Sequence, residues 1–175
     1  NFLLHAGNVL LVYALGLRLA GGGWRPAWVA AAWAVNPLLT QLVTNIVGRA
    51  DLLAGLAVLG GFLIYLKSTE AAGARRWAWL ALLALVTAVG SFAKESAVTV
   101  LGVIALYEAI WWKQRRQAWG LVLGCVAMLI PIQMMLYQRA AVLFSSQPTN
   151  FPFYDNPIGG AGWLLGRLTA LKVVG

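Results

Sequence analysis

Cysteine, histidine and acidic residues are all scarce in this chain of 175 residues, which has one Cys, one His and five Asp or Glu. The single cysteine, Cys125, cannot form a disulfide within the chain, and the metal-type cysteine spacing is absent from the sequence. The sequence also lacks a glycine-rich phosphate loop, a zinc motif and a Ser/His/Asp arrangement. These absences argue against a disulfide scaffold and against the common soluble enzymes that depend on such motifs.

Charged residues are also few, and apolar residues take their place. Only 10% of the residues are charged, 61% are hydrophobic, and the mean hydropathy is +0.78. A soluble domain is usually about 25% charged and about 45–50% apolar. A soluble fold of this size cannot bury so much apolar surface, because surface area dominates in small domains. We therefore predict an integral membrane protein whose first partner is the lipid bilayer.

Long apolar runs divide the chain into predicted membrane spans. A membrane-crossing helix needs about 20 mostly apolar residues, and in lipid its backbone must be hydrogen-bonded internally, so each run should be helical. The predicted complete spans are Phe2–Ala20, Trp28–Val47, Leu52–Leu66, Trp77–Ala93, Ala97–Trp112 and Ala118–Leu136. A further run begins near Gly162. The predicted fold is all-α: a polytopic transmembrane helix bundle of about six complete spans plus a truncated seventh.

Basic residues gather in alternate connections between these runs. The connections at 18–25, 67–76 and 113–116 hold eight of the thirteen Lys and Arg. The positive-inside rule places them in the cytoplasm, and the N-terminus and the segment 139–160 outside. Tryptophans beside the same connections are typical of an aromatic belt at the headgroup level: Trp24, Trp28, Trp77, Trp79, Trp111, Trp112 and Trp119. Because the charge follows topology, the net charge of +8 does not indicate a nucleic acid partner.

The ends of the sequence bear on domain organisation. The chain begins with Asn1 rather than Met and ends at Gly175 within an apolar run. We therefore expect residues 1–175 to form a single transmembrane domain, cut from a parent chain that extends at both ends. The longest predicted loop, 141–160, is rich in Pro, Asn and aromatic residues and is expected on the outer side. Loops of that length are often functional.

Two pairs of opposite charges fall at predicted outer turns between apolar helices. One pair is Arg49 with Asp51, and the other is Lys94 with Glu95. Charges near the membrane interior are costly and tend to mark functional sites. Arg49 and Lys94 suit phosphate oxygens, while the carboxylates could accept sugar hydroxyls. Alternatively, the four residues form interfacial salt bridges, since both acids would begin helices where the helix dipole favours them.

Three other features lie inside the predicted spans. His5 and Asn8, three residues apart, share one face of the first span. They could contact substrate or transfer a proton, but we favour hydrogen bonding between helices. Glu108 lies near Lys113 and the cytoplasmic interface, so we expect its carboxylate to reach that interface or to pair there. Pro37 lies inside the second predicted span and should kink it.

Four stretches of the sequence, taken in order, resemble motifs of a known family. They are Asn1–Asn8 (N-x-L-L-H-x-x-N), Trp33–Pro37 with Gly48–Ala54 (F-A-x-H-P … G-R-A-D/E-x-L-A), Phe92–Ser96 (A-K-E), and Asp155–Pro157 with Arg167–Thr169 (D-N-P … R-x-L-T). Asn36 departs from the pattern, because the family more often has His before this proline. The chain resembles the transmembrane and tetratricopeptide-repeat protein O-mannosyltransferases and their bacterial relatives, in the type-C glycosyltransferase superfamily.

The resemblance implies an enzyme that transfers a mannose-like sugar from a polyprenyl-phosphate donor to protein Ser or Thr hydroxyls on the extracytoplasmic face. The family's catalytic acid would precede Asn1 and its tetratricopeptide repeats would follow Gly175, so no catalytic residue is assigned here. No metal and no tightly bound cofactor are expected, and the partners are lipid, the lipid-linked sugar and a protein acceptor. The residues expected to bind the substrate and its lipid phosphate are Arg49, Asp51, Lys94, Glu95, Asp155, Asn156 and Arg167.

Two alternative functions stay open. A transporter or flippase-like protein would favour charges at the membrane midplane and internal repeats, and we find neither in the sequence. A non-catalytic membrane anchor for a repeat domain would tolerate joint replacement of the four charged residues at the outer turns. A composition rich in Ala, Gly, Arg and Trp favours a bacterial inner membrane, with the endoplasmic reticulum membrane as the eukaryotic equivalent.

Overall fold

The computed structural model describes residues 1–115, 118–145, 162, 164–165 and 167–169. The secondary structure in these ranges is helical, without a strand, so the all-α prediction is confirmed for them. The chain divides into two compact units, Asn1–Gln138 and Arg139–Gly175. The first unit carries the site described below.

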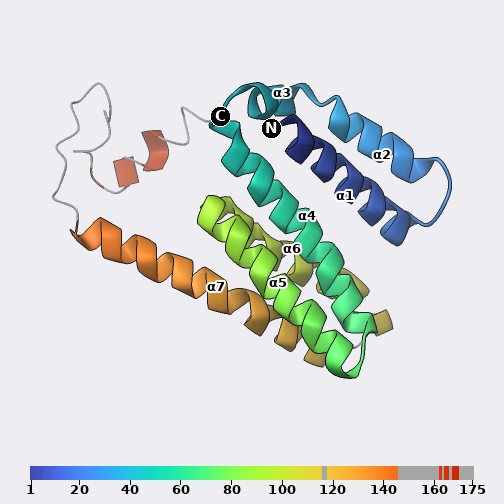
Figure 1. The fold of residues 1–175 in the computed structure, drawn as a ribbon. Helices are drawn as coiled ribbons and strands as arrows, with labels where there is room; N and C mark the ends of the chain where they lie inside the picture. The colour runs from blue at the N-terminus through green and yellow to red at the C-terminus, as the bar shows by residue number, and fades with distance from the viewer. Residues whose placement is uncertain (116–117, 146–161, 163, 166, 170–175) are drawn as a thin grey trace. The chain divides into compact units, whose positions relative to one another are not determined.

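The helices follow one another with short connections. In order they are α1 (Phe2–Ala20), α2 (Arg25–Ala34), α3 (Pro37–Thr44), α4 (Gly48–Glu70), α5 (Gly73–Ala93), the 3₁₀ helix η1 (Glu95–Val98), α6 (Thr99–Arg115) and α7 (Ala118–Ser145). Within the first unit α4 packs against α1, α5 and α6, and α2 lies beside α1 (Figure 1). Of the described helices, α1, α4, α5 and α7 are long and apolar enough to cross a membrane.

The prediction of one continuous span over Trp28–Val47 is wrong. The chain instead forms α2, of 10 residues, and α3, of 8 residues. The break falls at Asn36, because a proline disfavours the helical conformation in the residue before it. Asn36 is extended, and its side chain caps α3 by accepting a hydrogen bond from the Leu38 backbone N–H at 3.0 Å. At 1.5 Å per residue these helices are about 15 and 12 Å long, too short to cross a bilayer core of about 30 Å singly.

The predicted count of six spans is not confirmed either. α6 has 17 residues, follows η1, and is not among the four candidate spans of the described chain. α7 continues to Ser145, so residues 141–145, predicted as the start of an outer loop, are helical. The rest of that predicted loop, 146–160, lies outside the described residues. Where a truncated seventh span was expected, residues 164–165 and 167–169 are helical.

The core of the first unit lies where α4, α5, α6 and the first part of α7 meet. Its most deeply buried apolar side chains are Tyr65, Leu66, Leu83, Val100, Ile104 and Met128. Small residues bring the helices close together: a Cβ on Gly90 would overlap that of Ala57, and one on Gly124 would lie 2.7 Å from the Tyr65 ring. Such close approach is typical of membrane bundles, in which van der Waals packing holds the helices together.

The surface of the first unit is also apolar. Many large hydrophobic side chains on the long helices are exposed, among them Leu10, Leu85, Ile110 and Ile130. In water such a surface would be a liability, whereas lipid tails solvate it well. The tryptophans Trp24, Trp28, Trp77 and Trp119 are exposed as well, as expected of a belt at the headgroup level. The protein is therefore an integral membrane protein.

Candidate functional site at the Asp51 end of α4

The first turn of α4 is held in place by a close crossing of α3. A Cβ on Gly48 would lie 2.5 Å from the Cα of Leu42 and 2.7 Å from its carbonyl carbon. No other residue type could occupy this position without displacing backbone, so glycine is required for steric reasons. The glycine of the Gly48–Asp51 motif thus fixes α3 against the turn that carries Arg49 and Asp51.

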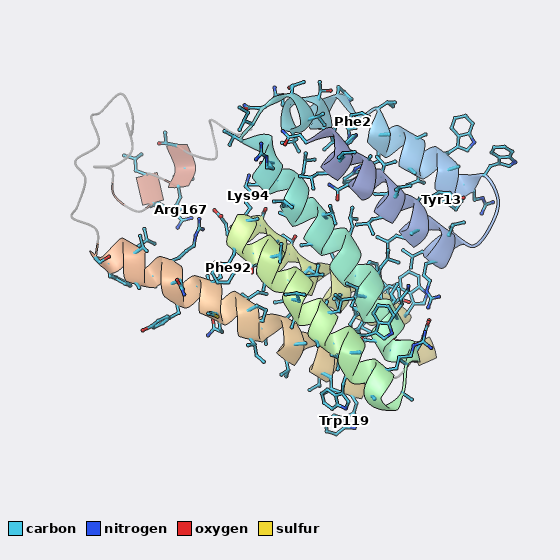
Figure 2. The ribbon with its side chains drawn as sticks, viewed as in Figure 1. Phe2, Tyr13, Phe92, Lys94, Trp119 and Arg167 are labelled. Carbon is cyan, nitrogen blue, oxygen red and sulfur yellow. The ribbon has the colours of Figure 1, made fainter. Side chains whose placement is uncertain are left out.

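An ion pair joins the start of α4 to the end of α5. The Lys94 ammonium donates to the Asp51 carboxylate. Lys94 follows α5 in an extended conformation (φ −157°, ψ 136°) that ends the helix. We name the region where α4 begins and α5 ends the Asp51 end. Figure 2 shows Lys94 there, and it shows Trp119 towards the opposite ends of these two helices. The sequence suggested a pair within each motif, but the structure pairs the two motifs across helices.

The other two charged residues of the predicted outer turns, Arg49 and Glu95, are exposed at the Asp51 end. Arg49 forms no salt bridge within the described part of the chain, so its guanidinium is available to an anion. Glu95 is the first residue of η1, next to Lys94. The site therefore presents one open guanidinium together with an ammonium that a carboxylate partly neutralises. This arrangement suits a phosphate better than a carboxylate-only cluster would.

Polar side chains on one face of α1 bind backbone carbonyls where the neighbouring helices are broken or begin. The hydrogen bonds are Asn1 Nδ2 to Asn45 O (2.6 Å) and Leu42 O (3.2 Å), His5 Nε2 to Ala34 O (3.1 Å), and Asn8 Nδ2 to Leu52 O (3.0 Å). The end of a helix leaves carbonyls, such as those of Ala34 and Leu42, that need donors in the apolar interior, whereas the Leu52 carbonyl lies within α4. His5 and Asn8 thus hold α2 and α4 against α1, and a role toward substrate remains a prediction.

The other predicted site residues do not belong to this cluster as described. Asp155 and Asn156 lie outside the described residues. Arg167 is exposed on a helical stretch of the second unit. The site at the Asp51 end is therefore built from the first unit alone.

A buried polar contact in the core was missed from the sequence. The Tyr65 hydroxyl donates to Glu108 Oε1 at 2.8 Å, and the exposed fractions of the two residues are 0% and 1%. The Glu108 carboxylate therefore does not extend to the surface of the described structure, as one of its two expected arrangements required, and pairing near the interface stays a prediction. The position of Glu108 within an apolar run was the sequence signal for a buried polar contact. The sequence could not identify its partner, because Tyr65 lies 43 residues away on another helix.

Comparison with known proteins places the chain among named relatives. Protein O-mannosyl-transferase Tmtc2 of Drosophila melanogaster is 32% identical over 167 residues, which is 90% of this chain. Protein O-mannosyl-transferase TMTC2 of Homo sapiens is 29% identical over 95% of this chain, and human TMTC3 is 38% identical over 43% of it. The chain is a homologue of the TMTC proteins. The resemblance predicted from the four motifs is confirmed.

The chain spans about a fifth of the length of its TMTC2 relatives, 17% of the fly protein and 21% of the human one. No family model matches the chain, and no solved structure matches it. The TMTC relatives named here are animal proteins, so they give no support to the bacterial inner membrane that the composition favoured.

Proposed function

We propose that this chain is the membrane-embedded part of a type-C glycosyltransferase. It would take a mannose-like sugar from a polyprenyl-phosphate donor and transfer it to protein hydroxyls on the extracytoplasmic face. Homology to proteins named O-mannosyl-transferases supports sugar transfer, and their animal origin favours the endoplasmic reticulum membrane. The observation that carries the donor site is the Asp51–Lys94 ion pair, which joins α4 to α5 and leaves Arg49 exposed on the same turn.

The proposed donor site follows from the chemistry of these groups. A guanidinium binds two phosphate oxygens at once, whereas an ammonium acts as a point charge. Arg49 would therefore bind the lipid phosphate. Lys94, oriented by Asp51, would neutralise the rest of the negative charge on the phosphate. Asp51 and Glu95 can accept hydrogen bonds from sugar hydroxyls. Because the site lies at the end of a membrane helix, the phosphate would lie at the interface and the prenyl chain in the hydrocarbon. Asp155, Asn156 and Arg167 remain proposed donor-binding residues.

The proposal is tested by comparing two single arginine replacements in the full-length protein. Transfer from polyprenyl-phosphate-mannose to a Ser/Thr peptide is measured in nanodiscs for Arg49→Gln and Arg25→Gln. Arg25 is an exposed arginine in the first turn of α2, away from the Asp51 end. Loss of a bidentate charged contact should lower kcat/KM for the donor about 10- to 100-fold in Arg49→Gln. Arg25→Gln should retain the wild-type value.

Equal activity in the two variants would exclude Arg49 as a donor ligand. A fourfold variant, Arg49→Gln, Asp51→Asn, Lys94→Gln and Glu95→Gln, separates the enzyme from a non-catalytic anchor. An anchor would retain the activity of the whole protein with all four charges removed, whereas the proposed donor site would lose it. Equal detergent extraction and elution volume for every variant show that folding is preserved.

A second candidate function, a transporter, is favoured by the buried Glu108. Ionisable groups inside a membrane bundle often serve ion or substrate pathways, and Glu108 lies in α6 against Tyr65 of α4. This function predicts that the reconstituted protein moves a lipid-linked sugar across liposome membranes and that Glu108→Gln abolishes the movement. Sugar transfer with no flux in wild-type liposomes would leave Glu108 a structural role only.

A further inference from the structure

A pocket of about 340 Å³ opens at the end of α4 opposite the proposed donor site. It lies where α1 and α4 end and α5 begins, and we name it the Glu70 pocket. It is lined by Arg18, Lys67, Glu70, Ala71, Arg75 and Trp79. Glu70 follows Asp51 by 19 positions (70 − 51) on the continuous helix α4, which corresponds to about 28 Å. That separation is close to the thickness of the hydrocarbon core, about 30 Å, so the pocket lies at the opposite membrane interface.

Basic side chains outnumber acidic ones in the Glu70 pocket. Three cations and one carboxylate line it, which leaves a formal charge of +2 (3 − 1). Arg18 pairs with Glu70. The Lys67 ammonium lies over the Trp79 ring, 5.0 Å from its centroid. Arg75 is exposed and forms no ion pair in the part of the chain that the structure describes. The pocket thus has positive charge that its own acid does not neutralise.

The position of the pocket at the headgroup level of the membrane favours a lipid as the source of a compensating anion. Trp77, two residues after Arg75, is exposed, and Trp79 lines the pocket itself. Indole rings concentrate at the headgroup level of a bilayer. Basic pockets between transmembrane helices, facing the leaflet that carries anionic lipid, bind headgroups. A volume near 340 Å³ is in the range of small-ligand sites.

We propose that the Glu70 pocket binds the headgroup of an anionic glycerophospholipid that carries hydroxyl groups, such as phosphatidylinositol. Arg75 and Lys67 hold the phosphate oxygens, and the Trp79 indole packs beside the headgroup. Glu70, oriented by Arg18, accepts hydrogen bonds from the headgroup hydroxyls. A carboxylate in the pocket disfavours a headgroup that brings its own carboxylate, as phosphatidylserine does. This site is independent of sugar transfer, because it lies at the other end of α4.

The test is lipid binding to the purified full-length protein, measured by native mass spectrometry. The ligands titrated are phosphatidylinositol, phosphatidylserine, phosphatidylcholine and soluble glycerophosphoinositol. The variants are Lys67→Gln with Arg75→Gln, and Arg25→Gln as the matched control, because Arg25 is also basic, exposed and in a predicted cytoplasmic connection. Lys67 and Arg75 line the pocket and Arg25 does not. Each of the two lining residues should contribute about fivefold in affinity, so the double variant should lose about 25-fold.

The expected pattern is preference for phosphatidylinositol, a large loss in the double variant and less than twofold loss in Arg25→Gln. An equal loss in Arg25→Gln would mean that general surface charge attracts the lipid, and it would overturn the pocket. Glycerophosphoinositol binding as tightly as the lipid would overturn the assignment to a lipid headgroup. Equal binding of phosphatidylserine would overturn the role given to Glu70.

Discussion

The two ends of α4 carry similar charges but are built differently. At the Asp51 end the chain is packed tightly, with α3 crossing Gly48 and with Asn1, His5 and Asn8 bonded to backbone carbonyls. At the Glu70 end a pocket opens among three helix ends. The connection between α1 and α2 there contains Gly21 and Gly23, both with positive φ.

The difference shows what each end is suited to do. A site that must position a reacting phosphate gains from rigid support, since small misplacements cost catalytic rate. A headgroup site only has to supply charge and space at the right depth. The ion pairs themselves do not distinguish the ends, because both are partly exposed: 30% and 38% for Asp51 and Lys94, 40% and 55% for Arg18 and Glu70.

The largest expected effect tests this contrast with the same change at both ends. Gly48→Ala should destabilise the protein by about 3 kcal/mol, because the new Cβ would collide with the Leu42 backbone. Gly22→Ala, at the other end, meets no atom within 4 Å and should change stability by less than about 0.5 kcal/mol. The measurement is unfolding by SDS in mixed micelles. Equal effects at the two glycines would refute the contrast in packing.

A second comparison asks whether tight polar packing is confined to the Asp51 end. Tyr65→Phe removes the buried hydroxyl that donates to Glu108 and should cost about 1.5 kcal/mol. Tyr137→Phe, an exposed tyrosine on α7, is the control and should be neutral. Both are measured by the same unfolding assay. If Tyr65→Phe is neutral too, the polar contact between α4 and α6 does not stabilise the core.

A smaller loss is expected from the buried amide on α1. Asn8→Ala removes the bond to the Leu52 carbonyl, and interhelical hydrogen bonds in membranes contribute about 0.6 kcal/mol on average. Gln133→Ala, at an exposed position of α7, supplies the control for losing an amide. Unfolding midpoints of the two variants give the difference directly. If Gln133→Ala lowers the unfolding midpoint as much as Asn8→Ala does, the proposed role of Asn8 in holding α4 against α1 is wrong.

The smallest effects belong to the two ion pairs. Double-mutant cycles with Asp51→Asn and Lys94→Gln, and with Arg18→Gln and Glu70→Gln, should each give a coupling energy below about 1 kcal/mol. The less exposed Asp51–Lys94 pair should give the larger value. Raising the salt concentration should reduce both. Coupling of several kcal/mol at either end would show a buried pair and would contradict the exposures.

The outline of the fold was predictable because it depends on local features of the chain. The span Phe2–Ala20 coincides with α1, and the runs at Leu52, Trp77 and Ala118 lie within α4, α5 and α7. Apolar length decides membrane helices almost by itself, since lipid leaves the backbone no other partner. The error at Trp28–Val47 came from treating Pro37 as a kink, when Asn36 could cap a new helix and so stabilise a full break.

The candidate site was predictable only in its composition. The motifs supplied Arg49, Asp51, Lys94 and Glu95, but each acid was matched with the base beside it in sequence. The partner that Asp51 takes is Lys94, 43 residues away. Sequence spacing cannot give that pairing, because it depends on where the ends of α4 and α5 meet.

Hydropathy and short motifs act locally, so they were enough to predict a helical membrane protein related to the TMTC proteins. The tertiary structure decided which charges pair, where Glu108 lies and that a basic pocket exists. Tyr65 with Glu108, and Arg18 with Glu70, join residues on separate helices. Such contacts depend on how closely the helices pack. For example, a Cβ on Gly61 of α4 would lie 3.2 Å from the Val100 side chain of α6, and this closeness is a property of packed surfaces rather than of sequence neighbours.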